Sequence, residues 1–310
     1  MSATSSNAPL VSVIIPHLNQ PDFLRACLSS FPKSGEGETP AYEILVVDNG
    51  SKILPHDIIA EFPNARLLEE AEAGPGPARN KGVSEARGEF LAFTDSDCVI
   101  DEGWVARIAM YFSENPDAHA LAGDVYILRG DPQNPTALEA YEGVYAFRTK
   151  MYVKKDGYSS TNNLAVRAST MKEVGGFAGK DIAEDRDWGK RAGAMGFETR
   201  WIDKMIVHHP ARADFGELCK KWNRQTSHDY VTIHEGSNGR VKWLLRAGAL
   251  AVSPLAEIPT ILKAPRISGG RERLMAFWVL VKIRLYRTWI MLKMALNKNV
   301  VKKMSGAWNA

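Results

Sequence analysis

Short apolar runs in the first hundred residues end in polar side chains that could bind a cation or a phosphorylated ligand. These residues are His17 and Asn19, then Asp48 and Asn49, then Asp95 and Asp97. Any one of them could be a turn-forming Asp or Asn without a further role. Ligands of open α/β sheets, however, bind beyond the carboxyl ends of the strands. Because two runs typical of buried strands close with carboxylates, we expect a site at that edge.

The segment Asp95-Ser-Asp97 places two hard oxygen ligands near one point. Mg²⁺ and Mn²⁺ prefer such oxygens and usually share them with substrate phosphates. A cation held there would neutralise the charge that grows on a departing diphosphate. His208 or His209, which close a later apolar segment, could complete the coordination, although a solvent-facing pair is the simpler alternative.

Glu184 and Asp185 stand where a later helix is expected to begin. A carboxylate at this position could accept a proton from an attacking hydroxyl, which typically contributes roughly 10²–10⁴ in rate. Acidic residues also occur in first helical turns simply because the helix dipole favours them. Arg79 follows a loop rich in Gly and Pro, and it could face donor phosphates or pair with surface acids.

The elements that must position these residues alternate between strands and helices. We expect strands at 10–16, 42–47, 65–68, 90–94, 120–128, 160–167 and 199–207. We expect helices at 22–31, 77–86, 103–112, 136–152 and 184–194. The alternation predicts an α/β fold with a Rossmann-like, mostly parallel sheet flanked by helices.

The net charge of +3 hides an uneven distribution. From Arg240 onward, 14 Lys and Arg face only Glu257 and Glu272, so this part carries +12 and the preceding 239 residues carry −9. A nucleic-acid-binding protein would place its basic excess on the folded domain, so we expect no nucleic-acid partner. Three widely spaced cysteines argue against a disulfide framework or a zinc site and fit a reducing cytosol.

The basic carboxyl-terminal part is also apolar and aromatic. The segments 243–262 and 274–296 are rich in apolar residues, but each contains charges that are costly at mid-membrane. Basic residues mixed with Trp and Tyr fit amphipathic helices lying in an anionic membrane interface, while packing onto protein is the alternative. We therefore expect a flexible terminus at 1–9, a sheet domain at 10–235 and a helical, membrane-associating extension at 236–310.

Several motifs together resemble glycosyltransferase family 2, the inverting enzymes with the GT-A fold. They are Val11-Ser-Val-Ile-Ile-Pro16 with Asn19, Glu43-Ile-Leu-Val-Val-Asp-Asn-Gly-Ser51, Gly76-Pro-Ala-Arg-Asn-Lys-Gly82, Gly88-Glu-Phe-Leu-Ala-Phe-Thr-Asp-Ser-Asp97, Asn163-Leu-Ala-Val-Arg167, Gly175-Gly-Phe177, Ala183-Glu-Asp-Arg-Asp187 and Val207-His208. They occur in the family's order with similar spacing, over about residues 10 to 215. Each motif alone is weakly specific, and the set is highly specific.

The resemblance implies a role for each matching residue. The catalytic base would be Asp185, with Glu184 as its neighbour, and the metal ligands would be Asp97 and His208, with His209 as the fallback. Asp48 would hydrogen-bond the donor's base. The other donor-binding residues implied are Pro16, Asn19, Arg79, Asn80, Asp95, Ser96, Gly175 and Gly176.

The implied activity is the inverting transfer of one sugar from a nucleotide-diphosphate sugar, with Mn²⁺ or Mg²⁺ as cofactor. We expect a UDP-sugar donor and a lipid-linked acceptor or cell-surface glycan precursor, handled at the cytoplasmic face of a membrane. The chain departs from the family at Leu18, where an aromatic residue is frequent, and it lacks the Gln-x-x-Arg-Trp motif of polymerising synthases. Processive synthesis is therefore not expected.

Two other functions are compatible with parts of the sequence. A sugar nucleotidyltransferase would need a Gly-rich, basic loop after the first strand, but His17 to Gln20 follow instead. A non-catalytic binding protein with the same fold would be indicated by loss of Asp97 or Asp185, and both are present.

Overall fold

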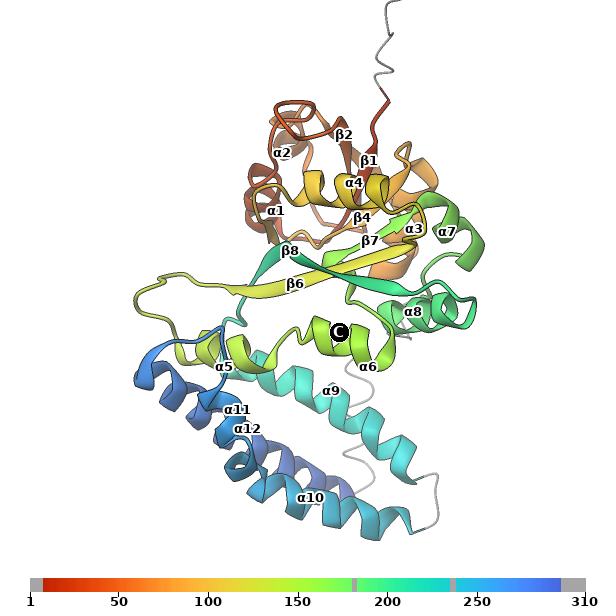
Figure 1. Ribbon diagram of the computed structural model, residues 1–310. Helices are drawn as coiled ribbons and strands as arrows, with labels where there is room; N and C mark the ends of the chain where they lie inside the picture. The colour runs from red at the N-terminus through yellow and green to blue at the C-terminus, as the bar shows by residue number, and fades with distance from the viewer. Residues whose placement is uncertain (1–7, 180–182, 235–237, 297–310) are drawn as a thin grey trace, which may run out of the picture. The chain divides into compact units, whose positions relative to one another are not determined.

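The computed structural model describes residues 8–179, 183–234 and 238–296. The chain divides into two compact units, each drawn in Figure 1. The described residues within 1–126 and 147–210 form the first, here called the sheet unit, and those within 127–146 and 211–310 form the second, the helical unit. The helical unit thus takes in segment 127–146 and begins before the expected boundary at 236. Of the terminus expected at 1–9, residues 1–7 lie outside the described residues.

Among the described residues, the strands form one eight-stranded sheet with the order β3-β2-β1-β4-β7-β6-β8-β5. The strands are β1 Val11–His17, β2 Tyr42–Asp48, β3 Ala65–Glu69, β4 Phe90–Phe93, β5 Val99–Ile100, β6 Ala120–Leu128, β7 Leu164–Arg167 and β8 Thr199–Pro210. The first four pair in parallel, whereas β7 runs antiparallel to β4 and β6, and β5 antiparallel to β8. The predicted α/β fold is confirmed, with a mixed sheet.

Helices cover both faces of this sheet. In the sheet unit they are α1 Pro21–Ser29, α2 His56–Ala60, α3 Pro75–Glu85, α4 Trp104–Glu114, α6 Thr149–Asp156, the short 3-10 helix η1 Thr161–Asn163, α7 Ala168–Val174 and α8 Glu184–Ala194. Alternate side chains of β1 point to opposite faces, so Val13 and Ile15 join one core and Ile14 the other. The first core contacts α1, α2 and α4, and the second contacts α3, α7 and α8.

The helix expected at 136–152 is instead two helices, α5 Ala137–Tyr145 and α6. The chain between them includes Phe147, whose φ of 46° lies in the left-handed region. A non-glycine residue in that conformation cannot continue a right-handed helix. The break falls where the chain passes from one unit to the other.

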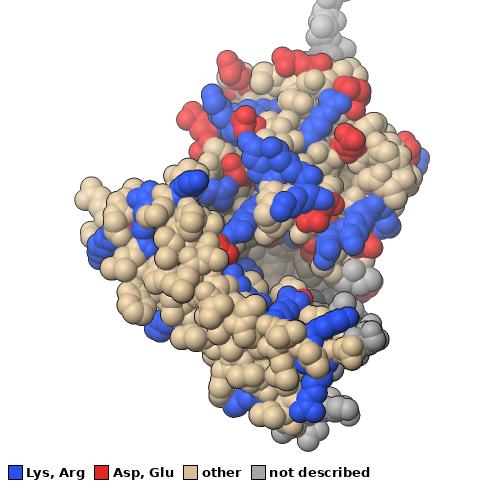
Figure 2. All heavy atoms as spheres, turned by 60° about the horizontal axis from the view of Figure 1, so that its bottom comes forward, with Lys and Arg blue, Asp and Glu red and all other residues tan. Residues whose placement is uncertain are grey.

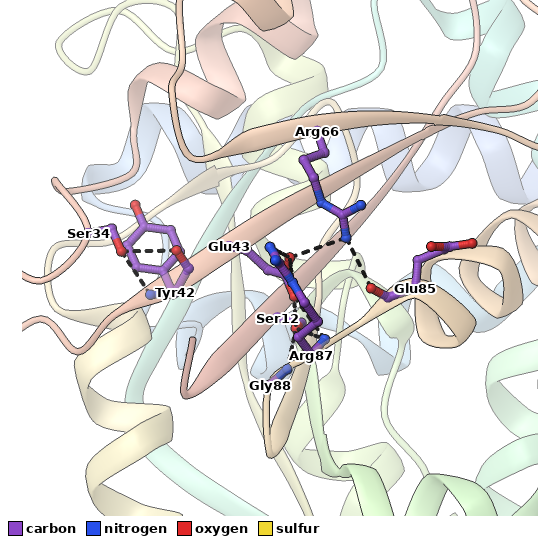
Figure 3. A network of polar contacts seen from close by, with 8 residues as sticks. All are labelled: Ser12, Ser34, Tyr42, Glu43, Arg66, Glu85, Arg87 and Gly88. Atoms are coloured by element: carbon purple, nitrogen blue, oxygen red, sulfur yellow. Dashed lines mark hydrogen bonds and ion pairs between the residues drawn. The ribbon is translucent and has the colours of Figure 1, made fainter. Parts of the chain in front are cut away.

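A polar network fixes the amino-terminal edge of the parallel strands (Figure 3). The buried carboxylate of Glu43, near the start of β2, accepts hydrogen bonds from the Ser12 hydroxyl at 2.8 Å, the Arg87 guanidinium at 2.7 Å and the Arg66 guanidinium at 3.3 Å. Burial alone raises the pKa of Glu43, but the donors of Arg87 and Ser12 outweigh it and the net pKa is lowered. The Ser12 hydroxyl also accepts from the Gly88 amide.

The helical unit consists of α5, α9 Phe215–His234, α10 Gly239–Ala256, α11 Ile258–Leu262 and α12 Gly269–Leu296. A capping box between Thr136 and Glu139 begins α5. The core joins α5, α9, α11 and α12, and a second cluster joins α9, α10 and α12. Within that second cluster, the indole of Trp243 donates to the Met291 carbonyl at 2.8 Å. The helical extension predicted from the sequence is confirmed.

Candidate active site

A pocket of about 550 Å³ opens at the carboxyl ends of β1, β2 and β4, and every residue that lines it belongs to the sheet unit. Seven of the expected site residues line it, namely Pro16, Arg79, Asp95, Ser96, Asp97, Glu184 and Asp185. The other expected residues, which do not line it, are Asn19, Asp48, Asn80, Gly175, Gly176 and His208. Around this pocket the structure thus brings together Asp95, Asp97, Glu184 and Asp185, whereas Asp48 and His208 are not among its lining residues.

The carboxylate of Asp48 is buried and forms hydrogen bonds with neighbouring groups of the protein. Its Oδ2 accepts from His17 Nδ1 at 3.0 Å, and its Oδ1 accepts from the backbone amides of Gly50 and Ser51. Burial raises the pKa of Asp48, but the hydrogen bonds from Ser51, His17 and Gly50 outweigh burial and lower it overall. His17 Nε2 accepts from the Gln20 amide at 3.3 Å, and His17 lines the pocket in place of Asp48.

Two asparagines hold the loops that follow β1 and β2 through side-chain hydrogen bonds. Asn19 has φ of 53°, and its side chain accepts from the Lys52 amide while its own amide donates to the Ser51 hydroxyl. Asn49 donates to the carbonyls of Glu70 and Glu72 and accepts from the Gly74 amide, which holds the loop that leads into α3. Asn19 thus supports the pocket without lining it, and Asn49 lines it.

Arg79 joins two acidic parts of the pocket. Its guanidinium donates to Asp95 Oδ1 at 2.7 Å and to Glu184 Oε1 at 2.8 Å, and the side chain is only 3% exposed. Its Nε is buried without a hydrogen-bond partner among the described residues. Arg79 therefore links the Asp-x-Asp segment to the start of α8, and it partly balances four carboxylates.

His209, and not His208, lies beside Asp97. His209 Nε2 is 3.3 Å from Asp97 Oδ2, whereas His208 Nε2 is 3.8 Å from Asp101 Oδ1. The physical reason is strand alternation: neighbouring residues of β8 point to opposite sides. Of the two histidines, His209, the fallback in the sequence-based prediction, is therefore the one that lies near Asp97.

His209 directs its two ring nitrogens at different groups. Its Nδ1 contacts the Pro210 carbonyl at 2.6 Å, and a carbonyl can only accept, so Nδ1 carries a proton. The other ring nitrogen, Nε2, lies beside the carboxylate of Asp97. Burial raises the pKa of Asp97, opposed by His209 and reinforced by the negative charge of Asp95. Two electron-pair donors and a nearby second carboxylate match the ligand chemistry of a divalent cation.

Asp185 differs from its neighbour Glu184 in what it contacts. Glu184 is paired with Arg79, while the one hydrogen bond that Asp185 accepts among the described residues comes from the Arg186 amide of its own helix. Burial and then the charge of Glu184 raise the pKa of Asp185. A carboxylate with a raised pKa, facing a pocket and not paired with a cation, is suited to accept a proton.

Asn80 and the glycines that follow α7 form one structural unit. The Asn80 amide donates to the Phe177 carbonyl at 2.9 Å, and its Oδ1 accepts from the Phe177 amide at 2.8 Å. A Cβ on Gly176 would stand 2.7 Å from Asn80 Oδ1, so no larger residue fits there. Gly175 has φ of 84°, in the left-handed region. These three residues position the loop and do not line the pocket.

Some lining residues were not assigned from the sequence. His17 and Gln20 line the pocket without having been predicted as site residues, and Phe147 and segment 160–162 line it as well. Ser96 donates to the Gln20 amide oxygen at 3.2 Å, which links β1 and β4 across the pocket. The sequence signal was the polar run Thr161-Asn-Asn163 directly before the apolar residues of β7, and the structure buries all three side chains.

Comparison with known proteins agrees with this geometry. The model of "Glycosyl transferase family 2" matches residues 12–174. The chain is 34% identical to "Glycosyltransferase AglE" of Haloferax volcanii over 228 residues, which are 70% of this chain and 72% of that protein. It is 36% identical over 124 residues, 38% of this chain and 47% of the relative, to a "PGL/p-HBAD biosynthesis glycosyltransferase" of Mycobacterium bovis.

Two solved structures share the fold at 17% identity. The mannosyltransferase PcManGT from Pyrobaculum calidifontis, in complex with GDP-Man and Mn²⁺, has a TM-score of 0.55 and matches 93% of this chain and 87% of its own. TarS 1–349 of S. aureus, in complex with UDP-GlcNAc, has a TM-score of 0.51 and matches 96% of this chain and 91% of its own. The family match and the identity to the Haloferax relative show the family, and the two solved structures show the fold. The chain belongs to glycosyltransferase family 2 and is a glycosyltransferase of the GT-A fold.

Proposed function

We propose that this glycosyltransferase moves a single sugar from a UDP-sugar to a lipid-linked acceptor or cell-surface glycan precursor, with inversion at the anomeric carbon. The observation that carries the proposal is one pocket of about 550 Å³ lined at once by Asp95, Asp97, Glu184 and Asp185. Only Arg79 among the lining residues is a permanent cation. An anionic diphosphate can enter such a pocket only together with a compensating cation.

The proposed cofactor is Mn²⁺ or Mg²⁺, held by Asp97 and His209. Among the described residues there is no group of three or more His, Cys, Asp or Glu arranged to hold a metal. Two protein ligands fit a cation that takes its remaining ligands from diphosphate oxygens and water. When bound, the metal would neutralise the charge that develops on the leaving diphosphate. His209 Nδ1, bonded to the Pro210 carbonyl, orients the ring for this contact.

The proposed base is Asp185. Its carboxylate accepts the proton of the acceptor hydroxyl as that oxygen forms the new bond to the anomeric carbon, on the face opposite the departing diphosphate. Glu184 holds Arg79 and so supports the pocket as a positioning residue. Asp95, on the other side of the same guanidinium, keeps this side chain in place for the donor.

A screen of nucleotide sugars tests the donor proposal. We expect a UDP-sugar to raise the unfolding temperature of the full chain in Mn²⁺ and to lose this effect in EDTA. GDP-, ADP- and dTDP-sugars serve as controls for the base, because two structures of the same fold bind different bases. Stabilisation that is equal with and without Mn²⁺ would contradict the metal, and a preference for another base would contradict uridine.

The proposed acceptor is reached at the cytoplasmic face of a membrane. Large apolar side chains are exposed along α10 and α12, among them Leu245, Val252, Leu255, Leu274, Trp278 and Trp289. Figure 2 shows tan and blue with little red over the face that the helical unit presents. Apolar side chains interspersed with cations fit a helix layer resting in an anionic interface.

One helical stretch among the described residues, Gly239–Leu262, has the length and composition of a membrane-crossing helix, and 17% of its most apolar window is buried. Pro254 and Glu257 lie within it, which favours an interfacial position over a crossing one. Flotation with phosphatidylglycerol vesicles tests the location, with phosphatidylcholine vesicles as the control. Equal recovery in the bottom fraction with and without anionic lipid would contradict a membrane partner.

A further inference from the structure

A groove of about 330 Å³ lies within the helical unit, between α11 and the first two turns of α12. Its α11 wall consists of Ile258, Ile261 and Leu262, and its α12 wall of Gly270, Arg273, Leu274 and Phe277. Both sets follow the i, i+3, i+4 spacing that places side chains on one helix face. The two helices therefore turn matching apolar faces toward a shared hollow.

The groove has a buried floor and exposed walls. Ile261 is 3% exposed, whereas Leu262 is 59% and Leu274 is 57% exposed. Walls of this kind leave apolar surface in contact with water, which is unfavourable by about 25 cal/mol per Å² until something apolar covers it. Two further exposed apolar side chains, Leu255 near the end of α10 and Trp278 in α12, are close in sequence to the lining residues. Leu274 belongs both to the groove and to the exposed apolar side chains proposed to meet the membrane.

Cations without acidic partners surround the groove. Arg273, in its wall, donates to the carbonyls of Leu262 and Gly269. Lys263 and Arg271 are next to lining residues, and none of these three cations forms an ion pair with an acid within residues 8–179, 183–234 and 238–296. The acid nearest in sequence, Glu272, is occupied by Arg129 and Ser268. The mouth of the groove therefore carries uncompensated positive charge.

We propose that this groove binds one acyl chain of an anionic phospholipid, with the phosphate of the head group near Arg273. An apolar hollow next to unpaired cations complements a molecule with a hydrocarbon chain attached to a phosphate. The proposal extends the membrane location proposed above from a surface to a defined lipid site. A free anion would leave the apolar walls uncovered, and a purely apolar ligand would leave the cations unused.

Gly270 offers a way to fill the groove without disturbing the helices. A Cβ at Gly270 would meet nothing within 4 Å, and its φ is not in the left-handed region. Gly270→Leu therefore places four carbons in the space proposed for the acyl chain. Gly248, in α10, also has open space around its Cβ and does not line the groove. Gly248→Leu is the matched control, since both substitutions also raise helix propensity.

The test titrates the full chain with monomeric dihexanoyl phosphatidylglycerol, below the concentration at which it forms micelles, and follows binding by calorimetry. We expect Gly270→Leu to weaken binding by about tenfold or more, since each displaced methylene contributes about fourfold. Gly248→Leu should bind as the unmodified chain does. Unchanged binding in Gly270→Leu, or an equal loss in both variants, overturns the proposal.

Further measurements separate the contribution of the lipid head group from that of the acyl chain. Dihexanoyl phosphatidylcholine should bind about fivefold more weakly, and Arg273→Gln should remove most of that difference while the exposed Arg240→Gln does not. Glycerol phosphate alone should not bind detectably; if it binds as tightly as the lipid, a chain site is excluded. A dimer that Gly270→Leu dissociates would assign the groove to a second copy. Donor binding in Mn²⁺, measured in parallel, reports on the proposed transferase reaction independently.

Discussion

Carboxylates near the amino-terminal ends of the parallel strands differ from those near the carboxyl ends in how the surrounding protein compensates their charge. Near the start of β2, Glu43 receives donors from Ser12, Arg66 and Arg87, and its pKa is lowered. Beyond the opposite edge, burial raises the pKa of Asp97 and Asp185, and neither has an arginine partner among the described residues. Both regions withdraw acidic groups from water. Donors within the chain compensate the charge of Glu43, whereas Arg79 and His209 compensate the carboxylates of the pocket only in part.

This difference separates a structural cluster from a catalytic one. A buried carboxylate without compensating donors is unfavourable in the folded state, so it persists where a ligand supplies the missing charge. A compensated carboxylate has no remaining capacity for substrate. The contrast can be tested by neutralising carboxylates at each end, since loss of function is expected at one edge and loss of stability at the other.

Removing Asp97 should have the largest effect. We expect Asp97→Ala to lower turnover by about 10³-fold or more and to abolish the Mn²⁺-dependent binding of donor, because the cation loses its carboxylate ligand. Donor-dependent thermal shifts with and without Mn²⁺ measure this directly. The control is Asp117→Ala, an exposed acid of the sheet unit paired with Arg200. If Asp97→Ala keeps its metal dependence, Asp97 does not hold the cation.

Replacing Asp185 should affect chemistry and spare binding. We expect Asp185→Asn to reduce kcat by roughly 10² or more while the affinity for donor stays within about twofold, as for a lost base. Asp187→Asn is the matched control, since Asp187 lies in the same first turn of α8, pairs with Arg191 and does not line the pocket. A fully active Asp185→Asn enzyme would show that another group accepts the proton.

The pH dependence should carry the signature of the same carboxylate. Because the pKa of Asp185 is raised, the base is protonated at a higher pH than an ordinary aspartate, and kcat should fall on the acid side earlier than a pKa of about 3.9 would give. The pH profile of kcat in the unmodified enzyme measures this fall at acid pH. If the same fall persists in Asp185→Asn, a different group causes it.

Replacing the two histidines of β8 should change Mn²⁺ binding by different amounts, and both effects should be smaller than the effect of removing Asp97. We expect His209→Ala to weaken Mn²⁺ binding by about 10–100-fold, whereas His208→Ala should change it by less than about twofold. Only His209 faces Asp97, and His208 stands beside Asp101. Titration of Mn²⁺ in the presence of donor compares the two variants. Equal losses in both would place the metal elsewhere in the pocket.

The sequence was sufficient to predict most strands and helices of the sheet unit and the edge of the sheet at which Asp95 and Asp97 lie. Apolar runs that end at Asp48 and at the Asp95-Ser-Asp97 segment follow from strand periodicity, and parallel pairing brings their ends to one edge. The antiparallel pairing of β7 did not follow from those patterns, because a short apolar run has no signal for its direction.

Side-chain direction was the part that the sequence left open. Whether His208 or His209 faces Asp97 depends on the register of β8, and one residue of shift exchanges the two. Asp48 and Asn80 were expected to contact the donor, yet their polar atoms bond to His17 and Phe177. Hydrogen bonds between residues as distant as Asn80 and Phe177 depend on the folded arrangement and leave no local pattern. The roles of these residues toward the donor stay predictions.

Neutralising Glu43, near the amino-terminal ends of the parallel strands, should have the smallest effect on turnover. We expect Glu43→Gln to destabilise the fold by about 1–3 kcal/mol, since Arg66 and Arg87 lose a charged acceptor at a buried position. Turnover per folded molecule should remain unchanged, because Glu43 does not line the pocket. Urea unfolding and an activity assay on the same sample measure both quantities.

The dependence of that destabilisation on pH decides whether Glu43 acts through its charge. A carboxyl with a lowered folded pKa contributes its stability above its unfolded value near 4.5, and the contribution is lost as pH falls through the folded value. The difference in unfolding free energy between the unmodified chain and Glu43→Gln should therefore shrink as the medium is acidified below about pH 4.5. Asp185→Asn, which removes a carboxyl of raised pKa, should instead stabilise the protein without ligand at neutral pH. If both substitutions destabilise equally at neutral pH, the two ends of the sheet do not differ in how they compensate charge.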